Sequence, residues 1–154
     1  MAEDWTEVEP RGVVIDPMTG DPAVLLEDPR HTSIIAVPAD PSTATAIISE
    51  LEGIQRDPSH TLLYRFFIRH GVRVTRLELS VSRDREVVAN IIYSFAGEVC
   101  VMDVRPVDGL IVAIQTNAPI LAAGALIHSR ISTASPRVLD GRDLLILSRT
   151  HDRR

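Results

Sequence analysis

Lysine is absent from the sequence: all sixteen of its basic residues are arginine. Without lysine, the chain cannot form the lysine contact of a phosphate-binding P-loop, a Schiff base, or a nuclease site built from two acids and a lysine. There is one cysteine, Cys100, so a disulfide framework within the chain is excluded and a zinc site would need other ligands. These absences remove several classes of enzyme.

Long apolar runs are also missing. No stretch approaches the roughly 18–20 apolar residues that cross a bilayer. The first ten residues, MAEDWTEVEP, are acidic and lack the basic and apolar regions of a signal peptide. With 154 residues, of which 45% are hydrophobic, the chain is expected to be a soluble cytoplasmic domain with no membrane partner.

Charge is distributed unevenly along the chain. Residues 1–55 carry a net charge of −9, whereas residues 56–85 carry a net charge of +4. The overall charge of −5 argues against strong nonspecific binding to nucleic acid, but the central segment can present a basic face to phosphate. The candidate substrate-binding residues are Arg65, Arg69, Arg73 and Arg76. A solvated helix surface is the alternative interpretation.

Two sets of short apolar runs predict strands. The first set, residues 13–15, 23–26 and 33–37, is separated by turn-rich clusters and predicts an antiparallel meander. A second meander is predicted from residues 72–81, 86–95 and 99–104. In its first strand the alternation changes phase, which indicates a bulge near Thr75 and Arg76.

Three segments have helical periodicity. The first, residues 39–53, has Asp40 as its cap and a stripe predicted to be buried. That stripe consists of Ala44, Ile47, Ile48 and Leu51. In the second helix, residues 57–71, the side chains predicted to face inward are Leu63, Phe66 and Phe67. The third helix runs from Pro106 to about Asn117, and Pro119 prevents its continuation.

The predicted fold class is α+β: two antiparallel β-meanders with three helices packed against them. Residues 1–10 are predicted to be a flexible acidic leader and residues 11–127 the folded domain. Residues 128–154 are predicted to be a C-terminal extension, with a short hairpin around Asp140 and Gly141 and then a disordered end.

The stretch DVRPVDG, residues 103–109, places two acids and an arginine at a strand–helix junction. In a structural interpretation, Asp108 favours the positive pole of the helix and Arg105 pairs with one of the two acids. In a functional interpretation, Asp103 and Asp108 hold a divalent cation such as Mg²⁺, and Arg105 stabilises charge on a phosphoryl oxygen. Acid pairs at helix starts are common, so both interpretations stay open.

His60 is the second candidate for chemistry. It lies at the start of the second predicted helix, where the positive pole disfavours the protonated imidazole. A neutral imidazole there can act as a general base or as a metal ligand. Alternatively, it can simply form a hydrogen bond at the helix start.

Four segments, in the same order and at similar spacing, resemble the bifunctional nuclease family. They are GVVIDPMTGDPAVLLED, AIISELEG, RDPSHTLLYRFFIRHGV and DVRPVDGLIVAIQTNAPI, and together they span about residues 11–127. The last is the most specific, because the family pattern there reads approximately Asp-x-Arg-Pro-Ser-Asp-Ala, an apolar helix, and Ala-Pro-Ile. The matching positions are Asp103, Arg105, Pro106, Asp108, Ala118, Pro119 and Ile120.

The resemblance implies an α+β fold, self-association as a dimer or higher oligomer, and a nuclease that acts on RNA and DNA. Members of the family are mostly bacterial. The expected activity is hydrolysis of phosphodiester bonds with Mg²⁺ or Mn²⁺. The expected catalytic residues are His60, Asp103, Arg105 and Asp108, of which Asp103 and Asp108 hold the metal.

The chain also departs from the family pattern. Thr43 stands where the family usually has an acid before the alanine of the first helix, and Thr61 replaces the acid of a Thr-His-Asp motif. Val107 and Gly109 replace the serine and alanine that flank the second acid of the last motif. The loss of two acids motivates an alternative: a catalytically inactive homologue that serves as an oligomeric binding or regulatory module. Its binding surface would be residues 56–85 or the apolar segment 119–127.

Overall fold

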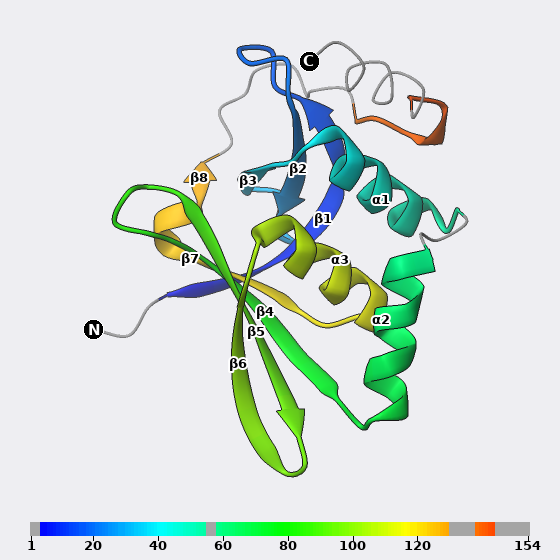
Figure 1. Ribbon diagram of the computed structural model, residues 1–154. Coiled ribbons are helices and arrows are strands. Elements are labelled where there is room, and N and C mark those ends of the chain that lie inside the picture. The colour runs from blue at the N-terminus through cyan, green and yellow to red at the C-terminus, as the bar shows by residue number, and fades with distance from the viewer. Residues whose placement is uncertain (1–3, 55–57, 130–137, 144–154) are drawn as a thin grey trace.

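The computed structural model describes residues 4–54, 58–129 and 138–143. Eight strands form one sheet in the order β6-β5-β4-β7-β1-β2-β3-β8 (Figure 1). The strands are β1 Trp5–Ile15, β2 Pro22–Glu27, β3 Ser33–Pro38, β4 Arg73–Val81, β5 Val87–Phe95, β6 Glu98–Val104, β7 Ile120–Ala123 and β8 His128–Ser129. The helices are α1 Pro41–Glu52, α2 Pro58–Arg69 and α3 Pro106–Thr116, with 3₁₀ turns at Gly124–Leu126 and Gly141–Asp143. The α+β class predicted from the sequence is therefore confirmed.

Both predicted meanders are present. Strands β1, β2 and β3 pair antiparallel in sequence order, and so do β4, β5 and β6. The register of β4 against β5 shifts between Val74 and Arg76, which is the bulge indicated by the change of phase. The alternation of apolar residues thus correctly predicted the two strand sets and the irregularity within one of them.

The seventh strand, β7, was not predicted and joins the two meanders. It pairs antiparallel with Trp5–Val8 of β1 and parallel with Leu77–Leu79 of β4. Ile120 and Ala122 are buried, so the segment 119–127 supplies a core strand and is not the partner surface suggested above. Four residues after a proline are too short for a clear alternation, and only the tertiary pairing identifies them as a strand.

The ends of the chain also differ from expectation. Strand β1 begins at Trp5, so residues 5–10 are part of the sheet and not of a flexible leader. Near the other end, Leu139 is buried and bridges to Val13, and residues 141–143 form a 3₁₀ turn in place of a hairpin turn. The second strand of the predicted hairpin and the end of the chain lie outside the described residues.

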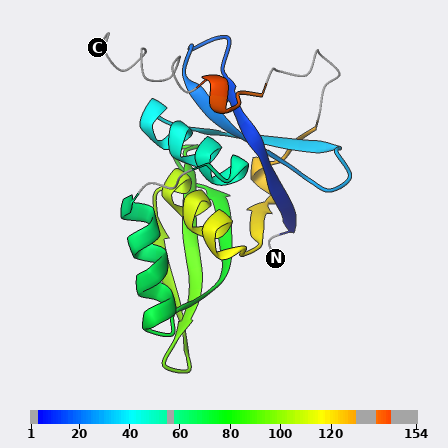
Figure 2. The same cartoon turned by 90° about the vertical axis from the view of Figure 1, so that its right-hand side faces the viewer.

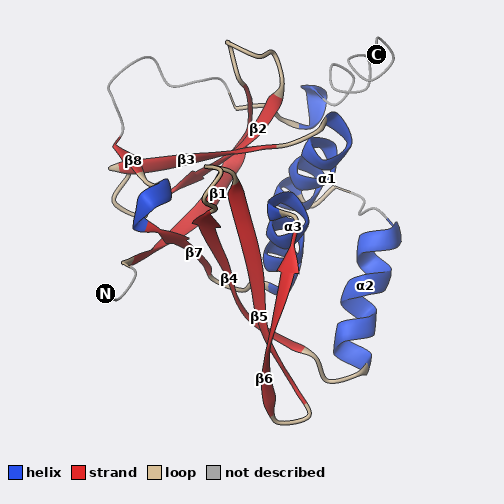
Figure 3. Cartoon of the chain, turned by 60° about the vertical axis from the view of Figure 1, so that its left-hand side comes forward, coloured by secondary structure: helices blue, strands red, loops and turns tan. Residues whose placement is uncertain are grey.

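The three helices lie on the same face of the sheet (Figure 3), with α3 between α1 and α2 (Figure 2). Helix α1 begins at the predicted cap Asp40, ends at Gly53 and buries Ala44, Ile47 and Ile48, whereas Leu51 is exposed, contrary to prediction. In the described part of the chain, no helix is long and apolar enough to cross a membrane.

Helix α2 is buried less than its pattern predicted. Phe67 is half-buried and packs against the core, but Leu63 and Phe66 are exposed. The helix contacts the rest of the molecule mainly through α3 at the margin of the fold, so only a narrow stripe of it is covered. Amphipathic spacing predicted the helix correctly and overestimated how much of the helix the core covers.

Candidate active site at the N-terminal ends of two helices

The polar residues of the stretch DVRPVDG lie at the start of helix α3. Arg105 is the residue before the helix, Pro106 is its first residue, and Asp108 lies in its first turn. The guanidinium of Arg105 donates two hydrogen bonds to the carboxylate of Asp108, from Nε to Oδ2 at 2.7 Å and from Nη2 to Oδ1 at 3.1 Å. This forked pair is largely exposed, and it occupies both carboxylate oxygens of Asp108.

A second carboxylate lies close to this pair. The pKa of Arg105 is raised, first by its hydrogen bond and charge interaction with Asp108 and further by the charge of Asp40. Asp40 caps helix α1, which packs against α3. Gln115 in the last turn of α3 donates to Glu50 in the last turn of α1 at 2.9 Å, so the two helices lie with their C-terminal ends together and their N-terminal ends on the same side. The guanidinium of Arg105 is thus influenced by two carboxylates, one from each helix start.

Asp40 is held in place by Thr43. The backbone N–H of Thr43 donates to Oδ1 of Asp40 at 2.9 Å, and the Thr43 hydroxyl donates to Oδ2 at 2.5 Å. Burial raises the pKa of Asp40, but the hydrogen bonds from Thr43 outweigh burial, so the net effect is a lowered pKa. Asp40 is therefore an ionised carboxylate at neutral pH with a fixed orientation.

The residues that depart from the family pattern have clear structural surroundings here. Thr43 is buried and acts through Asp40, and Val107 is buried in the core. Gly109 is buried where α3 meets the sheet: an added Cβ would lie 2.7 Å from Cδ1 of Leu77 and 3.1 Å from Cγ2 of Val104. Glycine therefore allows α3 to sit closer to β4 than a side chain would permit.

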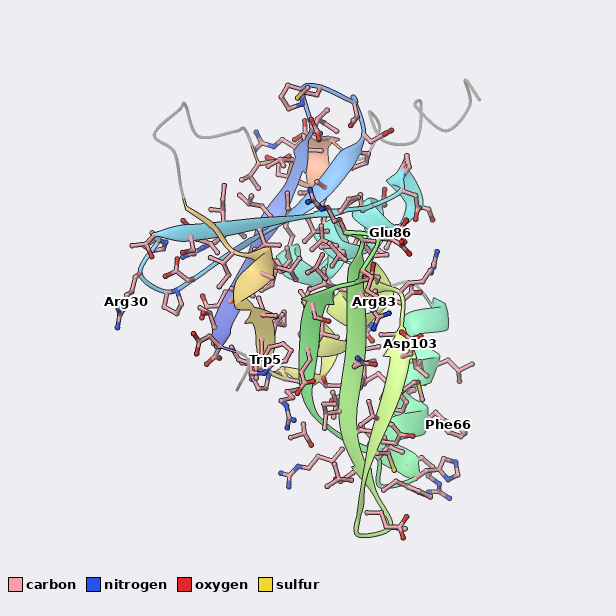
Figure 4. The ribbon with its side chains drawn as sticks, turned by 90° about the vertical axis from the view of Figure 1, so that its left-hand side faces the viewer. Trp5, Arg30, Phe66, Arg83, Glu86 and Asp103 are labelled. Atoms are coloured by element: carbon pink, nitrogen blue, oxygen red, sulfur yellow. The ribbon has the colours of Figure 1, made fainter. Side chains whose placement is uncertain are left out.

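Asp103 is not brought together with Asp108. Its neighbours on β6, Met102 and Val104, face the helices: Met102 lines a groove with Phe66, and Val104 lies beside Gly109. Because side chains alternate along a strand, Asp103 points to the opposite face of the sheet. Figure 4 views that face, with Asp103 labelled on β6 and the helices behind the strands.

His60 lies in the first turn of α2, as its sequence position predicted. The side chains of His60 and Thr61 lie outside the described residues, so the role of His60 as a base stays a prediction. Helix α2 contacts α3, so the backbone of α2 lies in the same layer as the helix that carries the Arg105–Asp108 pair.

The four candidate substrate-binding arginines are divided between two surfaces. Arg65 and Arg69 are exposed and one helical turn apart on α2. Arg76 lies on the opposite face of the sheet, because Leu77 beside it packs towards α3, and its Nε is 2.7 Å from Oε1 of Glu78. Arg73 is exposed at the start of β4. A single continuous basic strip is therefore not formed by these residues.

The site offers at most two carboxylates as ligands for a hard cation. Across the described ranges, no group of three or more histidine, cysteine, aspartate or glutamate residues is arranged to hold a metal ion. Mg²⁺, however, is usually bound through one or two carboxylates together with waters and substrate phosphate. Asp40 and Asp108 satisfy that requirement in chemical type, provided that Arg105 exchanges Asp108 for another anion.

Sequence reasoning identified Asp40 only as a helix cap and did not connect it with Arg105. A signal was present, since an Asp-Pro or Arg-Pro dipeptide begins both α1 and α3. The packing of α1 against α3, which brings the two helices together, cannot be inferred from the local sequence.

Fold and site together define an α+β domain with an acid–arginine–acid arrangement at adjoining helix starts. A model of the bifunctional nuclease domain matches residues 24–134, which is well over half of the chain. The chain therefore belongs to the bifunctional nuclease domain family. No curated protein matches the sequence.

Proposed function

We propose that the protein is a divergent nuclease that hydrolyses phosphodiester bonds in RNA or DNA with the help of a divalent cation. The observation that carries this proposal is the forked contact of Arg105 with Asp108 at the start of α3, which packs against the Asp40-capped helix α1. Membership of the bifunctional nuclease domain family supports the same reaction class.

Arg105 is the phosphate-binding residue in this proposal. Its guanidinium already makes a forked contact with a carboxylate, and phosphate presents oxygens in the same geometry. When a phosphodiester takes the place of Asp108, the positively charged guanidinium lies against the phosphoryl oxygens. There it stabilises the negative charge that develops on those oxygens in the transition state. The same exchange frees the carboxylate of Asp108.

Asp40 and Asp108 are the residues that would hold Mg²⁺ or Mn²⁺, which when bound supplies Lewis-acid stabilisation of the phosphoryl group. Asp40 stays ionised because Thr43 lowers its pKa, and Asp108 becomes available when Arg105 binds phosphate. Asp40 thus takes the place in the metal pair that the sequence suggested for Asp103. His60 remains the proposed base that accepts a proton from the attacking water.

Cleavage of end-labelled single-stranded RNA and DNA, with Mg²⁺, Mn²⁺ or EDTA, tests this function. Metal-dependent cleavage is expected from the natural chain, and Asp108→Asn should reduce it by about 100-fold or more. Asp84→Asn, in the exposed turn between β4 and β5, is the matched control and should cleave normally. Circular dichroism establishes that each variant is folded. Cleavage that survives in EDTA or in Asp108→Asn contradicts the proposal.

A second function is favoured by one specific observation: every carboxylate oxygen at the site already accepts a hydrogen bond from the protein. An inactive homologue that binds RNA or a regulatory partner needs no free carboxylate. It would give no cleavage with any metal, yet would retain RNA in a filter-binding assay that depends on Arg105. Binding lost in Arg105→Gln, with no cleavage by any variant, identifies this alternative.

A further inference from the structure

The aromatic residues of this chain are few and are concentrated in one place. The sequence contains three phenylalanines, two tyrosines and one tryptophan. Four of these six line a groove of about 330 Å³ between the end of α2 and strands β4, β5 and β6: Phe66, Phe67, Tyr93 and Phe95. A cleft of this size with mostly apolar and aromatic walls is typical of a binding site for a small molecule.

The groove has a helical wall and a floor formed by the sheet. Phe66 and His70 belong to the wall, and their ring centroids are 4.3 Å apart. Tyr93 and Met102 belong to the floor. Burial raises the pKa of Tyr93, and the neighbouring Cys100 thiol raises it further, so the phenol is uncharged at neutral pH. Phe66 lies on α2 beside β6 and is 56% exposed, so a ligand can reach its ring from solvent (Figure 4).

Negative charge lies at the mouth of this groove. In the pairing of β5 with β6, Glu98 is opposite Phe95 and Met102 is opposite Ile91. Residues directly opposite each other in a sheet point to the same face, so the exposed Glu98 lies on the groove side, beside Phe95. The C-terminal end of α2, which is the negative pole of that helix, borders the same groove.

The nearby arginines point elsewhere. At about 3.6 residues per turn, Arg65 and Arg69 point roughly 105–150° away from the mean direction of the three groove-lining residues of α2 and its end. Arg73 precedes Val74, which belongs to the floor, so strand alternation turns Arg73 to the other face of the sheet. None of the three arginines is among the described residues that line the groove. The ring faces, Glu98 and the helix pole therefore determine which charge the groove favours.

All three of these features favour a cation. The face of an aromatic ring is the negative part of its quadrupole, and clusters of rings recognise quaternary ammonium groups. We propose that the groove binds a small organic cation from solution, namely a quaternary or methylated ammonium group that carries an apolar chain. The ammonium group lies against the rings of Phe66 and Phe95 near Glu98, and the apolar chain lies on the floor beside Met102. This site is separate from the Arg105–Asp108 pair and does not depend on nuclease activity.

Nuclear magnetic resonance of the full chain, labelled with ¹³C at its methionine methyl groups, tests the site. Met102 lies in the groove, whereas Met18 is 94% exposed in the turn between β1 and β2. Octyltrimethylammonium should shift the Met102 signal in a saturable manner and leave the Met18 signal unchanged. Octanol and octanoate carry the same chain with a neutral and a negative head group. The cation should bind about 5-fold more tightly than either, because the rings and Glu98 attract only its head group.

Two substitutions at Phe66 separate the ring from its apolar surface. Phe66→Leu keeps an apolar side chain but removes one ring, so it should weaken binding of the cation by about 3–5-fold and leave binding of octanol almost unchanged. Phe66→Trp should bind the cation at least as tightly as the natural chain, because tryptophan is the best partner for a cation. Leu62→Ala changes an exposed side chain of α2 outside the groove and is the matched control. Circular dichroism establishes that each variant is folded.

The proposal is overturned by octanoate that binds as tightly as the cation, or by cation binding that Phe66→Leu does not change. A Met102 signal that moves with none of the three ligands, or one that moves only together with Met18, overturns it as well. Vesicles of phosphatidylcholine identify the other source of a quaternary ammonium group. Sedimentation of the chain with these vesicles, lost in Phe66→Leu, would assign the groove to a lipid head group and reject a small molecule from solution.

Discussion

Helices α1 and α2 have the same length of twelve residues, both begin with Pro-Ser, and each is followed within two residues by glycine. The core nevertheless covers them differently. Ile47 and Ile48 of α1 are almost completely buried, whereas Leu62 and Ile68 of α2 are more than 60% exposed. Similar local signals thus specify a helix in both cases, but tertiary contacts determine which surface covers each helix. For α1 it is the sheet and α3, whereas α2 contacts the rest of the molecule mainly through α3.

The largest expected effect comes from a matched pair of isoleucines. Ile47→Ala should lower the free energy of unfolding by about 2–5 kcal/mol, because it leaves a cavity in the core. Ile68→Ala should lower it by less than about 0.5 kcal/mol, since that side chain is 66% exposed. Urea unfolding of the two variants beside the natural chain measures both losses. Equal losses would mean that α2 is as buried as α1 within one chain.

The cap of α1 gives the next largest effect. Asp40→Ala should cost about 0.5–2 kcal/mol at neutral pH, because the N–H of Thr43 and its hydroxyl lose their acceptor. The pKa of Asp40 is lowered in the folded state, so its contribution is present above its ordinary pKa of 3.8 and is lost as pH falls through the folded value. The difference in unfolding temperature between the natural chain and Asp40→Ala should therefore disappear in strong acid. Asp84→Ala is the control, and a difference that persists in strong acid would contradict this account.

Gly109→Ala tests how closely α3 is seated. Alanine favours a helix by about 1 kcal/mol over glycine, but overpacking against buried Leu77 typically costs about 1–3 kcal/mol. We expect a net loss of roughly 1 kcal/mol, measured by urea unfolding. Leu77→Val should be less harmful in the Gly109→Ala chain than alone, because it removes the atoms that collide. Stabilisation by Gly109→Ala would show instead that α3 moves outward without cost.

The smallest expected effect on stability is at Arg105. Arg105→Gln should change the free energy of unfolding very little, since the Arg105–Asp108 pair is largely exposed. The effect should shrink further as salt is added, because exposed charges are screened. A loss of several kcal/mol, independent of salt, would identify Arg105 as part of the structural framework. Little loss of stability together with loss of cleavage or RNA binding identifies it as functional.

Local patterns in the sequence predicted much of this fold. The cap at Asp40, the stop at Gly53, both meanders and the bulge before Arg76 follow from residues close together in the chain. Strand β7 and the burial of α2 did not follow, because each depends on contacts between segments distant in sequence. Periodicity identifies a face that needs covering, but it does not identify what covers that face.

The candidate site was predictable in part. The spacing of Arg105 and Asp108 at a helix start correctly suggested that they pair. Assigning Asp103 to the same site was an extrapolation from nearness in sequence, and strand alternation turns that side chain away. Asp40 enters the site from a helix that begins 65 residues earlier, through packing that no local motif encodes.

The position of β7 has a consequence for how the chain is made. Trp5–Val8 leaves the ribosome long before its strand partner, residues 120–123. The two meanders can each form locally during synthesis, but they are joined only after α3 and β7 have emerged. Such long-range pairing slows folding, because closure of the intervening loop costs entropy before the contacts form. We therefore expect nascent chains truncated before Ile120 to be sensitive to protease at their N-terminal strand, and chains extended beyond Leu126 to become protected.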